Sequence, residues 1–118
     1  ASGPEALKML TEHRFDAVFA NASLFHAPLA VLPRVLGAIF ETLVPRGVLF
    51  CSNPRSFDVD DEGWQGGRYG CHLTTETWSR VIAAAGFVLE RHYVRPSDKP
   101  PSEQPWLAMV WRKPSLPR

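Results

Sequence analysis

His26 is the side chain of this sequence best suited to move a proton. An imidazole titrates near neutral pH, so His26 could act as a base toward an oxygen or nitrogen nucleophile. A structural alternative stays open: His26 stands two residues before Pro28 and could fix the start of a following helix through a hydrogen bond. We take His26 as the candidate catalytic residue.

A second group of polar side chains lies in a glycine-rich stretch later in the chain. Arg68 could bind a carboxylate or a phosphate through its guanidinium fork, and Tyr69 beside it could form part of a substrate lid. A structural use of both is an equal alternative. The nearby acidic residues could collect a divalent ion, but a solvated loop explains them more simply, and we predict no metal site. These residues are Asp58, Asp60, Asp61 and Glu62.

Neither the glycines nor the tryptophans of the chain indicate a ligand site of their own. The glycine cluster follows no strand and opens no helix, so we interpret it as a flexible loop and not as a phosphate or cofactor loop. The four tryptophans lack interleaved basic residues, which favours core and lid packing over base stacking. The glycines are Gly63, Gly66, Gly67 and Gly70, and the tryptophans are Trp64, Trp78, Trp106 and Trp111.

The composition is that of an ordinary globular domain. Of the 118 residues, 45% are hydrophobic and 21% are charged, which argues against disorder and fibrous repeats. A net charge of +1 provides no basic field for nucleic acid, and no apolar run approaches the roughly 20 residues that span a bilayer. Cys51 and Cys71 predict two reduced thiols. We expect a single cytoplasmic domain with neither nucleic acid nor a membrane as partner.

Two buried strands and the helix between them are expected in the first half of the chain. The apolar run within 15–21 does not alternate, which is typical of a parallel strand covered on both faces. Leucines, Ile39 and Phe40 recur at three and four residues and predict a helix over 30–44, with Pro33 in its first turn. A second buried strand is expected over 48–52, and helical spacing also occurs around Ala6, Leu7 and Leu10.

The second half of the chain predicts a long loop, a helix and two more strands. No periodicity is visible over 53–72, which indicates a functional loop. Thr74 can cap a helix over 75–85 that Gly86 ends. The alternating pattern of 87–94 is that of a strand near a sheet edge, and 106–112 is expected to return antiparallel after a proline-rich link.

This order of elements predicts an α/β fold. Alternating strands and helices imply right-handed crossovers, a mainly parallel sheet with an antiparallel strand pair at the C-terminal end, and helices on both faces. Ligands bind beyond the carboxyl ends of strands in such sheets. The residues placed there are Asn21, Ala22, Ser23, Leu24 and His26, with the segment 52–55, which includes Ser52, Asn53 and Arg55, beside them.

The residues that punctuate these elements resemble the second half of class I S-adenosylmethionine-dependent methyltransferases, from about Phe15 to Lys113. The run 15–21 is similar to the family's fourth strand. The segment 43–49, Leu-Val-Pro-Arg-Gly-Val-Leu, resembles its Leu-x-Pro-Gly-Gly segment, with Arg46 at a glycine position and a type I turn expected there. The segment 84–87 resembles its Ala-Gly-Phe. Two further segments, 67–69 and 105–107, resemble a bacterial, small-molecule methyltransferase-like branch whose substrates are poorly defined, so they do not name a substrate.

The resemblance implies a partial Rossmann-like methyltransferase fold and a divided site. Residues Asn21, Ala22, Ser23 and Leu24 would flank S-adenosylmethionine, and the substrate side would comprise Ser52, Asn53, Arg55, Arg68 and Tyr69. The family's glycine-rich turn, ribose-binding acid and adenine contacts do not precede Phe15. We therefore expect the substrate-facing half of a methyltransferase, inactive alone and without tightly bound cofactor. The alternative is a non-catalytic module that binds a partner or dimerises through the uncovered strand edge at 15–21.

Overall fold

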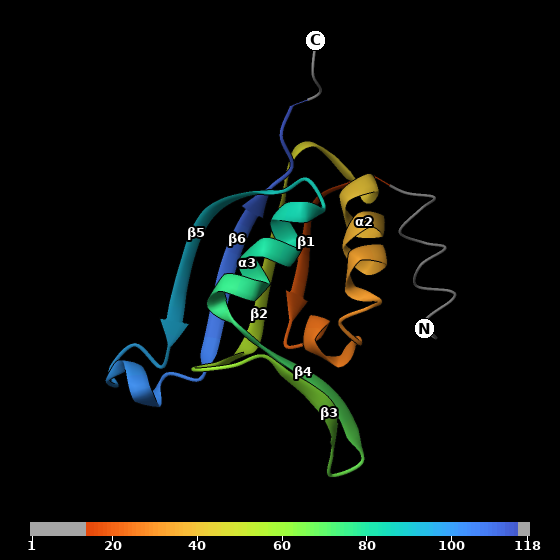
Figure 1. Ribbon diagram of the computed structural model, residues 1–118. Coiled ribbons are helices and arrows are strands. Elements are labelled where there is room, and N and C mark those ends of the chain that lie inside the picture. The colour runs from red at the N-terminus through yellow and green to blue at the C-terminus, as the bar shows by residue number, and fades with distance from the viewer. Residues whose placement is uncertain (1–13, 116–118) are drawn as a thin grey trace.

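The structure is a computed structural model that describes residues 14–115, and the predicted helical spacing at Ala6, Leu7 and Leu10 lies outside this range. Its strands and helices are shown in Figure 1. The strands are β1 (Phe15–Asn21), β2 (Leu43–Ser56), β3 (Asp61–Gln65), β4 (Arg68–Thr74), β5 (Val88–Arg95) and β6 (Trp106–Arg112). The helices are α2 (Leu32–Thr42) and α3 (Thr75–Ala84), with 3-10 turns η1 (Leu24–His26) and η2 (Pro101–Glu103).

Four strands form the main sheet in the order β1-β2-β6-β5 (Figure 1). β1 pairs with β2 in parallel, and its register places Phe19 beside Phe50 and Asn21 beside Ser52. β6 returns antiparallel between β2 and β5, as predicted for the strand over 106–112. The carboxyl ends of β1 and β2 therefore meet at one edge of the sheet, where ligands of open α/β sheets bind.

The helix boundaries follow from local chemistry. Pro33 lies in the first turn of α2, where no intrahelical N–H donor is required of it. The helix ends at Thr42, because Leu43 is already extended and begins β2, five residues earlier than the strand predicted over 48–52. Thr74 caps α3 by accepting a hydrogen bond from the Thr77 N–H at 3.2 Å.

The turn at Arg46 differs from the expectation. Arg46 has φ +71°, in the left-handed region, which excludes the type I turn predicted for this position. The backbone of Lys113 stabilises this conformation, since its carbonyl accepts from Arg46 N at 2.9 Å and its N–H donates to Gly47 O at 2.8 Å. Gly47 is required beside it, because a Cβ there would lie 2.8 Å from Val44 O.

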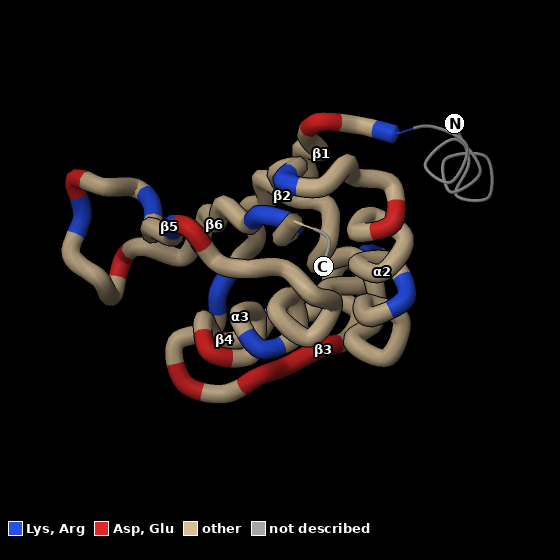
Figure 2. Tube along the Cα trace, turned by 90° about the horizontal axis from the view of Figure 1, so that it is seen from above, with Lys and Arg blue, Asp and Glu red and all other residues tan. Residues whose placement is uncertain are grey.

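The two described helices lie on the same face of the sheet (Figure 2). The core lies between this face and the helices, and it includes Trp78, Ile82, Leu49 and Trp111, all nearly or fully buried. The expectation of helices on both faces is met on one face only within residues 14–115. The second face carries exposed aromatic side chains, among them Phe19.

The loop predicted over 53–72 is wrong for most of its length. β2 continues to Ser56, and β3 and β4 form an antiparallel hairpin from Asp61 to Thr74. Gly66 and Gly67 have φ +56° and +80°, the positive pair that a two-residue type I′ turn requires. The hairpin is joined to β2 through two parallel register pairs and buries Cys71 and Leu73, because every second side chain of β4 faces the core.

Within the described part of the chain, neither helix has the length and apolarity needed to cross a membrane.

Candidate functional site

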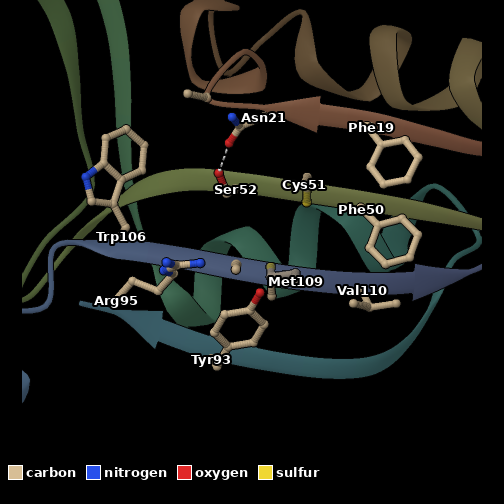
Figure 3. Close-up of a pocket in the computed structure, with 12 residues that line it drawn as sticks. Phe19, Asn21, Phe50, Cys51, Ser52, Tyr93, Arg95, Trp106, Met109 and Val110 are labelled. Carbon is tan, nitrogen blue, oxygen red and sulfur yellow. Dashed lines mark hydrogen bonds between the residues drawn. The ribbon is translucent and has the colours of Figure 1, made fainter. Parts of the chain in front are cut away.

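Asn21 and Ser52 are brought together at the carboxyl ends of β1 and β2. The Ser52 hydroxyl donates a hydrogen bond to Asn21 Oδ1 at 2.6 Å (Figure 3). The backbone then turns sharply, with Ala22 at φ +52° and its N–H donating to Ser52 O at 2.8 Å. Because Ala22 is not glycine, this left-handed conformation is costly, and it is stabilised by its own bond to Ser52 O and by the pairing of β1 with β2 that precedes it.

A cleft of about 610 Å³ opens on the uncovered face beside this pair (Figure 3). Phe19 and Phe50 form one wall, with their rings stacked at 4.8 Å between centroids, and the Phe19 side chain is 74% exposed. The other residues that line this cleft are Asn21, Ala22, Cys51, Ser52, Tyr93, Arg95, Trp106, Ala108, Met109 and Val110.

A second cleft, of about 340 Å³, lies between η1 and the hairpin. It is lined by Ala22, Phe25, His26, Gln65, Arg68, Tyr69, Gly70, His72 and Trp106. Ala22 and Trp106 line both clefts, so the two spaces adjoin at these residues. Three candidates from the sequence, His26, Arg68 and Tyr69, are thus gathered in one place.

His26 has a defined tautomer in this arrangement. Its Nδ1 lies 3.0 Å from the backbone oxygen of Tyr69. A carbonyl oxygen can only accept a hydrogen bond, so Nδ1 carries the hydrogen, and in the neutral ring Nε2 holds the lone pair. This contact joins η1 to the hairpin and leaves His26 with a basic nitrogen, so the structural and the catalytic readings of this residue are compatible.

Glu62 fixes the position of the hairpin over the second cleft. Its Oε2 accepts hydrogen bonds from the Leu29 N–H at 3.0 Å and from the Tyr69 hydroxyl at 2.7 Å. The bond from the Leu29 backbone, with that from Tyr69, lowers the pKa of Glu62, and the same Glu62 contact raises the pKa of Tyr69 to about 12. The phenol therefore stays protonated and holds the hairpin.

The other predicted site residues have partners within the chain. Asn53 is buried and its Oδ1 accepts from Phe25 N at 3.1 Å. The Arg55 guanidinium donates to Gln104 O at 2.7 Å and to Pro101 O at 2.8 Å, and it lies 4.4 Å from the Phe57 ring. Neither side chain lines either cleft, so their contacts support the site from behind.

The segment before η1 divides into exposed and buried positions. Ser23 is exposed and makes no side-chain capping hydrogen bond at η1. Leu24 is buried in the core, so its side chain anchors the segment.

Of the acidic residues, Asp60 accepts from Thr74 N at 2.8 Å and from Thr77 Oγ1 at 2.7 Å. No group of three or more potential metal ligands occurs in the part of the chain that the structure describes.

Several lining residues were not identified from the sequence. Phe19, Phe50 and Tyr93 were interpreted as parts of strands, and Trp106 as packing, yet all four line the open cleft. The apolar runs of β1 and β2 contained the signal, because strands that are apolar on both faces require cover on both faces. The sequence of 14–115 does not supply that second cover.

Comparison with known proteins supports the fold. No protein-family model matches the sequence, and no curated protein matches it significantly. Solved structures do match. The 1,6-didemethyltoxoflavin-N1-methyltransferase of Burkholderia thailandensis, determined with bound 1,6-didemethyltoxoflavin and S-adenosylhomocysteine, aligns with a TM-score of 0.76 and 23% identity over 86% of this chain and 45% of that protein.

Two further structures show the same likeness. An S-adenosylmethionine-dependent methyltransferase from Mesorhizobium loti aligns at TM-score 0.66 and 15% identity, over 84% of this chain and 62% of that one. The [4+2]-cyclase SpnF aligns at 0.69 and 18%, over 88% and 51%. The chain therefore spans about half the length of these proteins, and SpnF, named for a cyclisation, indicates that the fold alone does not fix the chemistry. Residues 14–115 therefore share the fold of the corresponding part of these S-adenosylmethionine-dependent methyltransferases.

Proposed function

We propose that this chain is the substrate-facing, C-terminal half of an S-adenosylmethionine-dependent methyltransferase that acts on a small molecule, and that it is inactive by itself. The observation that carries the proposal is the pair of adjoining clefts at the carboxyl ends of β1 and β2, in a domain of methyltransferase fold. Ligands bound in the two clefts would meet at Ala22 and Trp106. Its two free cysteines suit the reducing cytoplasm, where we place it.

The residues after β1 fit one side of the cofactor. Since Asn21 Oδ1 is occupied by Ser52, its amide NH₂, which has no partner among residues 14–115, can donate to a carboxylate or hydroxyl of S-adenosylmethionine. The Ser23 hydroxyl can also donate a hydrogen bond to the cofactor. Ala22 lines both clefts, and the buried side chain of Leu24 holds this segment in place. When bound, the cofactor supplies an activated methyl group, which leaves alignment, exclusion of water and proton uptake to the protein.

His26 is the proposed base. Its Nδ1–H is held by Tyr69 O, so Nε2 is the atom that would take a proton from an oxygen or nitrogen nucleophile. Tyr69 and Arg68 lie on the same hairpin and would cover and orient the substrate, while Ser52 keeps Asn21 in position. Asn53 and Arg55 would act as positioning residues behind the site.

Titration of S-adenosylmethionine and S-adenosylhomocysteine into the chain, followed by amide NMR shifts at millimolar ligand, tests the proposal. We expect saturable shifts at 21–26, which Asn21→Ala weakens and Arg34→Ala, an exposed change on α2, leaves intact. Shifts that are absent from 21–26, or that are unaffected by Asn21→Ala, would contradict a cofactor site at this position.

The exposed second face favours one other function, that of a non-catalytic module which dimerises. In the described residues, the segment Ala17–Asn21 of β1 pairs with β2 on one side only. The opposite edge of this segment could therefore pair with a strand of a second copy. Sedimentation over a concentration series would show a defined dimer that Phe19→Lys disrupts, together with no response to S-adenosylmethionine. A monomer at all concentrations would exclude this alternative.

A further inference from the structure

The second cleft has the chemistry of a site for a flat anion. We propose that it binds the methyl acceptor and that this acceptor is a planar aromatic molecule bearing a carboxylate. The inference rests on the proposed function in calling the ligand the acceptor, but the binding itself follows from the residues of the cleft. Its volume of about 340 Å³ is at the lower end of small-molecule sites, which suits a ligand of one or two rings.

Aromatic rings form most of the wall. The Phe25 ring lies 4.0 Å from the His26 ring, 6.1 Å from that of His72 and 6.4 Å from that of Trp106, measured between centroids. The Phe25 and Trp106 planes are nearly perpendicular, at 82°. Such a cluster presents ring faces and edges to an incoming planar molecule, which gains more from them than a puckered one does.

The charge of the cleft comes from Arg68. No aspartate or glutamate is among its lining residues, and the Arg68 guanidinium has no partner in the described part of the chain. Arg55 and Arg112 differ, since each donates hydrogen bonds within the protein. An unpartnered guanidinium at the rim of an aromatic cleft matches a planar carboxylate through two parallel hydrogen bonds.

The geometry around Arg68 is fixed before any ligand binds. The next residue, Tyr69, is held by its hydroxyl to Glu62 and by its backbone oxygen to His26. The positive φ values of Gly66 and Gly67 set the turn that precedes Arg68. A preorganised site loses less conformational entropy on binding, which strengthens a weak small-molecule contact.

The direct test compares 2-naphthoate with the neutral 2-naphthamide as probes, without any cofactor. We expect naphthoate to give saturable shifts of the His26 ring and the Trp106 indole, and to bind about tenfold more tightly than naphthamide, because only the carboxylate pairs with the guanidinium. Arg68→Gln should abolish this tenfold preference. Arg80→Gln, an equal loss of charge on α3, should leave it unchanged.

Each of the following results would overturn the proposal: equal affinity for the two probes, a preference that survives Arg68→Gln, an equal loss in Arg80→Gln, or tighter binding of cyclohexanecarboxylate than of benzoate. Tighter binding of naphthyl phosphate than of naphthoate would assign the cleft to phosphate and also overturn it. The outcome is separable from that of the proposed function. Naphthoate discrimination without any response to S-adenosylmethionine would contradict only the enzyme, and the reverse pattern would contradict only the acceptor class.

Discussion

The two faces of the main sheet carry similar side chains but differ in what covers them. On one face, Leu49, Met109 and Trp111 are buried beneath α2 and α3. On the other, Phe19 and Phe50 stack on each other with no helix above them in residues 14–115. Alternation along β2 explains how neighbouring residues, such as Leu49 and Phe50, come to lie in these different environments.

The difference indicates that the strands are adapted to a sheet with two covers. An exposed aromatic face of this kind is typical of an interaction surface. Under the proposed function the cover is the remainder of a methyltransferase domain, and under the alternative it is a second copy. Whether a face is covered can be tested by measuring how much its side chains contribute to the free energy of unfolding.

The largest expected effect comes from truncating a matched pair of phenylalanines. Phe87 is 3% exposed and packs edge-to-face against Phe40 at 5.1 Å. We expect Phe87→Ala to lower the free energy of unfolding by about 3–5 kcal/mol, and Phe19→Ala by about 1 kcal/mol or less, since Phe19 loses little beyond its stacking on Phe50. Urea denaturation of the two variants, monitored by circular dichroism, measures both.

The result for Phe19→Ala can contradict the view that the second face is uncovered. If Phe19→Ala costs as much as Phe87→Ala at low protein concentration, the second face is covered within the chain. A cost that appears only at high concentration would instead indicate cover by a second copy, because mass action then adds to stability.

Thiol labelling sharpens the comparison at two neighbouring positions of β2. Both residues line the open cleft, but Cys51 is buried in the core and burial raises the pKa of its thiol to about 12, whereas Ser52 is only partly buried. We expect iodoacetamide at pH 8 to modify the cysteine of Ser52→Cys at least about a hundredfold faster than native Cys51, because both access and thiolate fraction favour it. Peptide mass mapping follows the two sites and Cys71 in one sample.

Cys71 serves as the internal control for this experiment. It is fully buried, and burial first, then Glu62 and Asp60, raises the pKa of its thiol to about 11. Rapid labelling of Cys51 with slow labelling of Cys71 would show that the covered face opens independently of the hairpin, contrary to a rigid helix-covered layer.

The fold was largely predictable because its signals are local. The strands at 15–21 and 106–112 coincide with β1 and β6, and the helices at 30–44 and 75–85 contain α2 and α3. The hairpin was missed because its strands pair mainly with each other and β3 lies at the surface, so the sequence of β3 shows little apolar alternation. The adjacent Gly66 and Gly67 were the available signal, since both have positive φ.

The sequence predicted where the candidate residues lie in the sheet, but not which contacts they make. Residues that follow β1 and β2 lie at the expected edge, because chain order fixes the direction of parallel strands. The contact of His26 with Tyr69 spans 43 positions and depends on how the hairpin folds back, which no local pattern specifies. The pairing of Arg55 with Gln104 and Pro101 is equally non-local, spanning 49 and 46 positions.

The smallest expected effect is at Asp60, where the hairpin joins the covered layer. Its carboxylate accepts hydrogen bonds from the N–H of Thr74 and the hydroxyl of Thr77, so it assists the N-terminal cap of α3. We expect Asp60→Asn to lower the free energy of unfolding by about 1 kcal/mol at pH 7, as the loss of a helix cap does. The carboxylate of Asp61 has no partner in the described residues, so Asp61→Asn should change the free energy of unfolding by about 0.5 kcal/mol or less.

The pH dependence of this difference identifies its cause. The backbone hydrogen bond from Thr74, followed by the bond from Thr77, lowers the pKa of Asp60. A carboxyl whose folded pKa lies below its unfolded value of about 3.9 stabilises the protein above that pH, and this contribution is lost as the pH falls through the folded pKa. The gap between the native chain and Asp60→Asn should therefore close below about pH 4. A gap of constant size down to pH 2.5 would assign the effect to the shape of the side chain, and the ionised cap would then contribute nothing to joining the hairpin and the covered face.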